Sequence, residues 1–259
     1  MHGISFVGSG NVALALCNAL RGAGNEINLV VSRDERRGRE FASAFGAKWS
    51  DKLVFPRITD IIIVSVTDHQ LVTVLESIDC GENTIVAHTA GSFGLDVFPG
   101  KLKRKGVFYP LQTFSRGRIT DLKGIPVFTE SESAGTGKVL DDLALSLGAK
   151  VYSSDLPRRQ MLHAAAVFVS NFTNHMLTSG KDICENAGFP FDVLRPLIIE
   201  TVEKAVFLGP GNSQTGPAVR HDLITIEKHR DLLSYSPELN QLYTQISEAI
   251  MKYYKKPLK

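Results

Sequence analysis

The chain has 259 residues, of which 43% are hydrophobic and 22% charged, and its net charge is +2. This length can bury a substantial core, in one large domain or two of ordinary size. The balanced charge excludes the concentrated basic face that nucleic-acid binding requires. The longest apolar run, IIIVSV (61–66), is too short to span a bilayer. We therefore expect a soluble globular protein that binds neither nucleic acid nor membrane.

The three cysteines are far apart in the sequence, at Cys17, Cys80 and Cys184. No CxxC motif occurs, and no histidine stands near a cysteine at metal-ligand spacing. Such a scattered set is typical of reduced thiols in a cytosolic protein, so we expect no metal site. Nothing precedes the first strand pattern, which leaves no room for a signal peptide and predicts a cytoplasmic protein.

The first half of the chain alternates strand and helix patterns. The run 60–66 is almost wholly β-branched, as in a strand buried on both faces. Alternating strands and helices predict an α/β fold with a doubly wound, mostly parallel sheet. Strand patterns cover 3–8, 27–32, 60–66, 83–89, 106–110, 124–130 and 149–154. Helical patterns cover 11–23, 34–45, 69–78 and 131–147.

The second half, from 156 to 255, contains only long helical periodicities. The change comes at SSDLP (153–157), where a capping residue precedes a proline. We therefore predict two closely packed domains that share a cleft. They are a nucleotide-binding sheet domain at residues 1–154 and an all-α domain at residues 155–259, the latter serving substrate binding and dimerisation.

The stretch FVGSGNVA (6–13) carries a glycine pattern of the GxGxxG type that ends in alanine. It follows a predicted strand and opens a predicted helix, which is the context that a dinucleotide-binding loop requires. Gly8 would permit the tight turn, and Gly10 would let the backbone approach a pyrophosphate. The alternative is a simple tight turn. The backbone amides expected to face the anion are those of Ser9, Gly10, Asn11 and Val12.

The end of the second strand indicates which dinucleotide is bound. An NAD site usually has Asp or Glu there, whereas this chain has Ser32 and Arg33, with Arg37 shortly after. A hydroxyl and a guanidinium suit a 2′-phosphate, so we predict NADP. Asp34 is the contrary feature, but its position predicts a helix N-cap. Arg39 is expected on a solvated helix face.

Two further strand ends should lie near the nicotinamide, because ligands bind at the carboxyl ends of parallel strands. His88 ends one of these strands, and three readings remain open for it: a proton donor, a cofactor contact, or a buried hydrogen-bonded histidine. The other residues expected at the cofactor are Val66, Thr67, Asp68 and Thr89.

Four segments of the first half, namely ISFVGSGNVALAL (4–16), VVSRD (30–34), DIIIVSVTDHQL (60–71) and VAHTAGS (86–92), resemble the N-terminal Rossmann domain of NADP-dependent reductases. The pyrroline-5-carboxylate reductase and hydroxyacid dehydrogenase types share these features. The chain is most similar to a bacterial family of NADP oxidoreductases with a helical second domain of unassigned function.

The resemblance continues, more loosely, through FYPLQTFS (108–115), HAAAVFVSNF (163–172) and TGPAVRHD (215–222). It implies NADP as cofactor and a helical domain that often mediates dimerisation, hence a homodimer. It implies no substrate. The chain departs from the two better-known types: the late loop reads GPGNSQTGPAVRHD (209–222), and His163 stands in roughly the region where hydroxyacid dehydrogenases use a lysine.

The helix predicted over 157–187 is largely apolar, so we expect it to be well buried. At 100° per residue its polar side chains form a stripe, which must be satisfied by a partner helix, by water or by a ligand. We predict that the upper part of the stripe lines the cleft. The stripe consists of His163, Ser170, Asn174 and Lys181, with Asn171 at its edge.

The loop 209–222 is long and rich in Gly, Pro and polar residues, which suggests a functional role. Arg220 could bind a substrate carboxylate and Asp222 could orient it. The alternative is a local ion pair between these two residues, with Asp222 capping the next helix. Tyr109 and Gln112 are weaker candidates for the cleft.

These residues predict hydride transfer between NADP and a small, anionic carbonyl or imine metabolite. His163, assisted by Asn171, is the expected proton donor, and His88 is the second candidate. Two alternatives remain open: a deazaflavin-dependent NADP reductase, and a dinucleotide-binding regulatory or scaffold protein without turnover.

Overall fold

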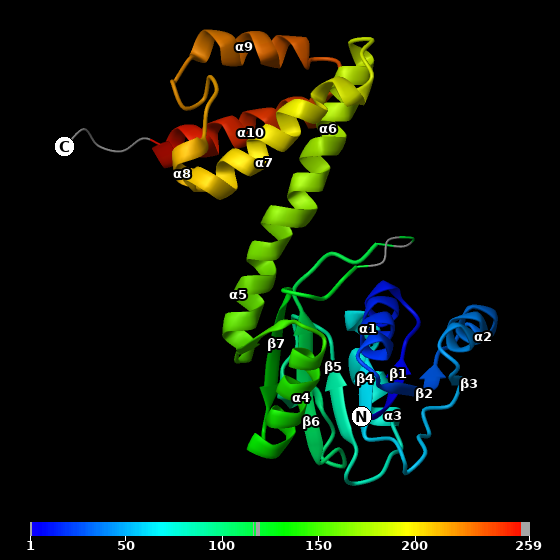
Figure 1. The fold of residues 1–259 in the computed structure, drawn as a ribbon. Helices are drawn as coiled ribbons and strands as arrows, with labels where there is room; N and C mark the ends of the chain where they lie inside the picture. The colour runs from blue at the N-terminus through cyan, green and yellow to red at the C-terminus, as the bar shows by residue number, and fades with distance from the viewer. Residues whose placement is uncertain (1, 116, 118–119, 255–259) are drawn as a thin grey trace. The chain divides into compact units, whose positions relative to one another are not determined.

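The structure, a computed structural model, describes residues 2–115, 117 and 120–254. The chain forms two compact units, Met1–Asn171 and Phe172–Lys259. The first unit is built on one sheet and the second on helices alone (Figure 1). None of the helices in the described ranges is long and apolar enough to cross a membrane.

The sheet of the first unit has its described strands in the order β3-β2-β1-β4-β5-β6-β7-β8. Neighbouring strands are parallel except β6 and β7, which are antiparallel. This confirms the predicted doubly wound, mostly parallel Rossmann sheet. The strands are β1 (Gly3–Val7), β2 (Glu26–Val31), β3 (Lys48–Ser50), β4 (Ile61–Val64), β5 (Ile85–His88), β6 (Arg104–Pro110), β7 (Pro126–Ser131) and β8 (Lys150–Ser153).

Helices cover both faces of this sheet. Alternate residues of β4 point to opposite sides: Ile61 and Ile63 join one buried cluster, Ile62 and Val64 the other. The expected burial of this strand on both faces is therefore confirmed. The helices of the sheet domain are α1 (Asn11–Gly22), α2 (Glu35–Ala44), α3 (Asp68–Ser77) and α4 (Ala134–Ser146), with a short 3₁₀ helix η1 (Leu95–Val97).

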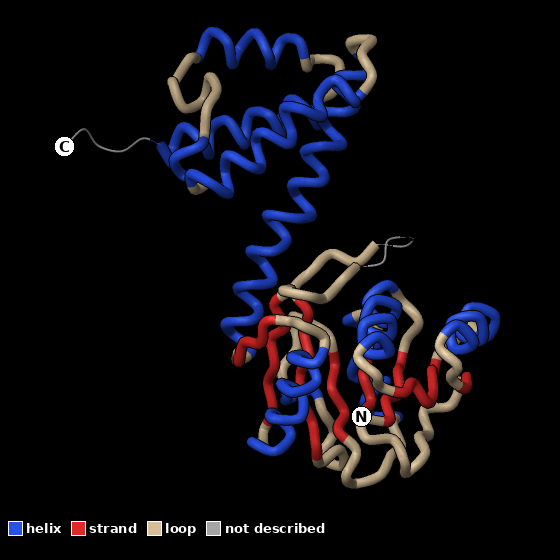
Figure 2. The backbone as a smooth tube through the Cα atoms, in the orientation of Figure 1, coloured by secondary structure: helices blue, strands red, loops and turns tan. Residues whose placement is uncertain are grey.

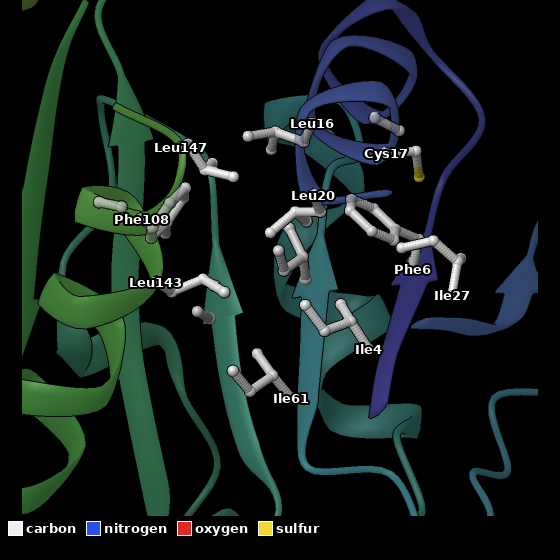
Figure 3. Close-up of a cluster of buried hydrophobic side chains, with 14 of the residues drawn as sticks. Ile4, Phe6, Leu16, Cys17, Leu20, Ile27, Ile61, Phe108, Leu143 and Leu147 are labelled. Atoms are coloured by element: carbon white, nitrogen blue, oxygen red, sulfur yellow. The ribbon is translucent and has the colours of Figure 1, made fainter. Parts of the chain in front are cut away.

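The larger cluster packs α1 and α4 against the sheet (Figure 3). Leu16 and Leu20 of α1 lie in it beside Ile4 and Phe6 of β1, and Leu143 of α4 lies in it with Phe108 of β6. Leu16 and Leu20 are fully buried. This packing fixes the start of α1, and with it the loop that joins β1 to α1.

One long helical run follows the sheet, as predicted, but its structure differs in two respects. It consists of α5 (Leu156–Val167), a π-helical segment (Phe168–Phe172) and α6 (Thr173–Asn186). The π-helical segment interrupts the 100° repeat from which the polar stripe was predicted. The run is also mostly exposed in the chain described here, with only Arg159 and Ser179 buried. The expectation of a well-buried helix was therefore wrong, because an apolar sequence pattern does not show which partner covers it.

The second unit has no strand among its described residues, and Figure 2 shows helices and loops there. Its core is small: in the described residues 172–254 only Ser179, Ala218, Ile226, Leu233 and Ser247 are buried. Its other helical elements are η3 (Phe191–Leu194), α7 (Arg195–Leu208), α8 (Pro210–Ser213), α9 (Leu223–Leu232) and α10 (Pro237–Tyr254).

Candidate active site

A cleft of about 850 Å³ opens at the carboxyl ends of β1, β2 and β4. It lies where parallel α/β sheets bind their ligands, beside the central strand β1. Eight of its lining residues were predicted at the cofactor: Gly8, Ser9, Gly10, Ser32, Arg33, Arg37, Val66 and Thr67. Its lining also includes Asp34, the contrary feature for NADP, and residues that the sequence did not single out: Val7, Val31, Asp51, Leu53, Ser65, His69, Gln70, Thr73 and Val74.

The glycine loop has two glycines with different requirements. Gly8 has a φ of +104°, and a Cβ there would lie 2.1 Å from the carbonyl oxygen of Ser65, so the turn itself requires glycine. A Cβ on Gly10 would meet no protein atom within 4 Å. Gly10 is also the N-cap of α1 and supplies no side-chain cap. The first amides of α1 are thus left open toward an anion, which fits a pyrophosphate.

Two cations line the cleft just after β2, where the 2′-phosphate is expected. Arg33 and Arg37 line it, whereas Arg36 and Arg39 do not. The latter two pair with glutamates of their own helix: Arg36 lies 3.9 Å from Glu40 and Arg39 lies 2.9 Å from Glu35. The structure thus separates the arginines that can meet a 2′-phosphate from those on the solvated helix face.

Asp34, the contrary feature for NADP, caps α2. Its carboxylate accepts a hydrogen bond of 2.9 Å from the Arg37 backbone N–H, which confirms the predicted N-cap. The Ser32 hydroxyl donates to the Asp34 carbonyl at 3.3 Å and accepts from Trp49 Nε1 at 3.1 Å. Ser32 must therefore release the Asp34 carbonyl before its hydroxyl can donate to a phosphate.

Of the three readings left open for His88, the structure supports the last, a buried hydrogen-bonded histidine. It is fully buried, its Nδ1 accepts from the Ala90 N–H at 3.2 Å, and its Nε2 faces the Gly94 carbonyl at 3.2 Å. The ring stacks on Phe98 with centroids 5.4 Å apart. Burial lowers the pKa of His88 to about 4. His88 is thus a neutral structural histidine, and neither catalysis nor cofactor contact suits it.

The remaining cofactor candidates lie just after the carboxyl ends of the inner strands, and they do not line the cleft. Asn11 and Val12 open α1, and the Asn11 amide donates to the Phe114 carbonyl at 3.0 Å. Asp68 begins α3, and the Thr89 N–H donates to the Val64 carbonyl at 3.1 Å.

A second group of polar residues meets at the carboxyl end of β6. The Tyr109 hydroxyl lies 2.9 Å from Nδ1 of His163, which is carried by α5. Tyr109 is 9% exposed and His163 is half-buried. Burial raises the pKa of the Tyr109 phenol above its ordinary value. From the sequence, Tyr109 was one of the weaker candidates. No sequence pattern indicates its contact with His163, which lies 54 residues away.

The start of α5 is fixed to the sheet domain by a buried cation. The Arg159 guanidinium is fully buried, 2.7 Å from the Glu130 carboxylate, and also donates to the Phe93 carbonyl. Gln160 donates to the Ser92 carbonyl at 3.1 Å. These contacts join α5 to the segment after β5 and so fix the place of His163.

The other predicted substrate residues are distributed over the two units. Ser170 and Asn171 lie in the π-helical segment of the first unit, whereas Asn174, Arg220 and Asp222 belong to the second. Lys181 pairs with Glu185 at 3.0 Å. The structure brings His163 and Tyr109 together, and the roles of the others stay predictions.

Part of the loop 209–222 forms the short helix α8. Asp222 caps α9, accepting hydrogen bonds from the Thr225 N–H at 3.0 Å and hydroxyl at 2.7 Å. Those hydrogen bonds lower the pKa of Asp222. The capping alternative is therefore confirmed, and the described ion pairs include none between Arg220 and Asp222. His221 has a φ of 54°, a strained conformation for a non-glycine residue and often found at functional sites.

The fold and the position of the cleft are those of a dinucleotide-binding protein. A family model described as "NADP oxidoreductase coenzyme F420-dependent" matches residues 3–91, and a model of a domain of unknown function, DUF2520, matches residues 125–250. The crystal structure described as "putative NADP oxidoreductase BF3122" from Bacteroides fragilis is 37% identical. That similarity covers 97% of this chain and 98% of that chain, with a TM-score of 0.89. The chain therefore belongs to this family of NADP oxidoreductases, and its cofactor is NADP.

More distant structures share the fold. A reductive aminase from Aspergillus terreus in complex with NADPH and ethyl-5-oxohexanoate has 12% identity and a TM-score of 0.73, covering 98% of this chain and 94% of that chain. An imine reductase from Myxococcus stipitatus in complex with NADP⁺ has 15% identity and a TM-score of 0.66, covering 98% and 93%. No curated protein matches the chain.

Proposed function

We propose that this NADP oxidoreductase transfers hydride between NADP and a small, anionic carbonyl or imine compound. The observation that carries the proposal is His163, a half-buried histidine held at the carboxyl edge of the sheet by Tyr109. A histidine can give or take a proton near neutral pH, and hydride transfer needs one such group.

The cleft residues bind and orient the cofactor. The open amides at the start of α1 receive the pyrophosphate, and Arg33 and Arg37 with Ser32 receive the 2′-phosphate. We keep as a proposal that Val66, Thr67, Asp68 and Thr89 border the nicotinamide. When bound, NADPH supplies the hydride.

The substrate residues are proposed by their chemistry. His163 gives a proton to the heteroatom of the substrate, and Asn171 assists it through its amide. Arg220, with a permanent positive charge, binds the carboxylate. Ser170, Asn174 and Asp222 complete the set proposed to bind substrate.

A turnover assay tests the proposal. Purified protein is screened with NADPH against small oxo-acids and cyclic imines, and His163→Asn is compared with the wild type. We expect turnover to fall by about a hundredfold or more in the variant, because general acid catalysis is lost, while NADPH affinity stays unchanged. Full activity in His163→Asn would refute the assignment. Tight NADPH binding without any turnover would favour a regulatory or scaffold role.

A deazaflavin-dependent reductase is the second candidate. The description of the family model that matches residues 3–91 favours it. That match covers only residues 3–91, so it supports NADP as the cofactor and gives no support for a particular second substrate. Adding a deazaflavin to the same assay with NADPH distinguishes the two: reduction of the deazaflavin alone would select the second candidate.

We also propose a homodimer formed through the helical unit. Large apolar side chains there are exposed, among them Val206 at 82% and Phe207 at 88%. With so few buried side chains, the described helices need a further apolar surface to cover them. A second copy of the chain supplies a self-complementary surface.

A further inference from the structure

Three segments of the sheet domain meet at the candidate proton donor. Tyr109 comes from the end of β6, His163 from α5, and Gly91 from the segment after β5. The rings of Tyr109 and His163 meet edge to face, with centroids 6.0 Å apart and planes at 68°. A Cβ on Gly91 would lie 3.0 Å from Tyr109 Cζ and 3.1 Å from His163 Nδ1.

The chemistry of the two groups decides which of them donates. A phenol is a better donor than acceptor, while a neutral imidazole nitrogen without a proton is a strong acceptor. Among the described residues, His163 is the only hydrogen-bond partner of the Tyr109 hydroxyl. The phenol therefore donates to Nδ1, and neutral His163 carries its own proton on Nε2.

The geometry also leaves Nε2 available. No described residue makes a hydrogen bond with this nitrogen, and the His163 side chain is half-buried rather than enclosed. The anchors at Arg159 and Gln160 hold the first turns of α5 in place. The imidazole thus has one nitrogen fixed by the protein and one free.

We propose that Tyr109 is a positioning residue that occupies Nδ1 of His163, so that Nε2 alone exchanges a proton with the substrate. Gly91 is glycine because the contact needs the space that a Cβ would fill. This inference rests on the proposed function, since it assigns the nitrogen through which His163 acts.

In the direction of reduction, the substrate takes up one hydride and one proton. Hydride adds to the carbonyl or imine carbon, and the π electron pair moves onto the heteroatom. Resting His163, with its proton on Nε2, first takes a proton from water on Nδ1, and this Nδ1–H then donates to the Tyr109 oxygen. The heteroatom takes the Nε2 proton of this imidazolium. His163 is left neutral with its proton on Nδ1, and exchange with water returns that proton to Nε2, so that the phenol again donates to Nδ1. Nδ1 stays bonded to Tyr109 in both charge states.

Nitrogen-15 NMR of the histidine rings, in protein without cofactor, tests the inference without turnover. The protonated and bare nitrogens of a neutral imidazole resonate far apart, so the spectrum reports the tautomer, and His163→Asn identifies the signals. We expect the Nε2–H tautomer for His163 in the wild type and a mixture of tautomers in Tyr109→Phe. His88 is an internal reference, because its backbone contacts fix the Nε2–H form.

A matched control exists in the second unit. The Tyr243 hydroxyl lies 2.9 Å from Nδ1 of His229, with the rings again edge to face. Tyr243→Phe removes the same kind of hydrogen bond elsewhere, and should change the signals of His229 and not those of His163. Gly91→Ala pushes Tyr109 and His163 away from residue 91 by a few tenths of an ångström without backbone strain, which disturbs their hydrogen bond, and it should change the His163 signals in the same direction as Tyr109→Phe.

Two outcomes overturn the inference: an Nδ1–H tautomer in the wild type, or His163 signals that are unchanged in Tyr109→Phe. Kinetics give a separate readout. We expect kcat to fall about tenfold in Tyr109→Phe with NADPH affinity unchanged, and no change in Tyr243→Phe. Failure of the proposed function shows differently, as full turnover in His163→Asn whatever the tautomer.

Discussion

Arg33 is the residue that we propose distinguishes NADPH from NADH. It lines the cleft with Arg37, whereas Arg36 lies on the exposed side of α2 beside Glu40. We expect Arg33→Ala to weaken NADPH binding by about tenfold to a hundredfold, because a charge-assisted hydrogen bond to the 2′-phosphate is lost. NADH binding should not change. Calorimetric titration with both nucleotides measures this.

Arg36→Ala is the matched control, since it removes the same charge from the neighbouring turn outside the cleft, and NADPH should bind it as the wild type. Equal binding of NADPH and NADH by the wild type would show that Ser32 and Arg33 do not read the phosphate.

His88 should give the fold a dependence on pH. Burial lowers its pKa to about 4 from an ordinary 6.5. Between these values the unfolded chain binds a proton that the folded chain does not, so the free energy of unfolding falls as pH falls through this window. The loss approaches about 3 kcal/mol near pH 4. Above pH 6.5 the effect is absent.

Urea unfolding at pH 7 and pH 4.5 checks this. His88→Asn is less stable at pH 7, and the gap to the wild type should narrow at pH 4.5. The exposed His175, changed to Gln, should keep the wild-type profile. A gap that stays constant with pH would contradict the assignment.

At the scale of elements, the buried ion pair of α5 decides whether this helix stays on the sheet domain. Arg159→Met leaves the Glu130 carboxylate without its partner, and we expect a loss of about 3 kcal/mol in the free energy of unfolding. Arg158→Ala, one residue earlier on the exposed side, should cost little. Urea unfolding of both variants measures the difference, and equal stabilities would show that the anchor is not the buried pair.

The sequence predicted elements well where the pattern was local. The glycine loop, the arginines after β2 and the Asp34 cap depend on neighbours within a few residues. The cap is confirmed, and the loop with Arg33 and Arg37 lines the cleft, while their contacts with the cofactor stay predictions. Strand β3 was missed, because KWS (48–50) offers three residues and no apolar run, and only pairing with β2 makes it a strand. The π-helical segment had no local signal either.

The site was predictable only in part. Its cofactor half follows from one loop and one strand end. The contact of Tyr109 with His163 joins residues 54 positions apart, and the role of Gly91 appears only when both rings are in place. The role of His88 depends on contacts only two and six residues away, with the Ala90 N–H and the Gly94 carbonyl, but the sequence pattern does not show the path of the loop that brings these groups to the ring.

For the whole molecule, the prediction concerns the proposed dimer of the helical unit. Phe207→Glu places a charge on an apolar side chain that is 88% exposed, and we expect it to convert the proposed dimer to monomers, because a buried charge is costly. Sedimentation velocity measures the oligomeric state of the variant and of the wild type. Ile58→Glu, at a residue of the sheet domain that is 74% exposed, should remain dimeric. A monomeric wild type would rule out the dimer.

The chain contains a single tryptophan, Trp49, and it lies beside Ser32, a cleft residue proposed to bind the 2′-phosphate. Its indole N–H is bonded to the Ser32 hydroxyl, and the Arg39 guanidinium lies 4.6 Å from its ring centre. Indole emission responds to nearby charge and to hydrogen bonding. We therefore expect the intrinsic fluorescence of this one residue to change when a 2′-phosphate binds at Ser32, which would make Trp49 an optical reporter that needs neither a label nor turnover.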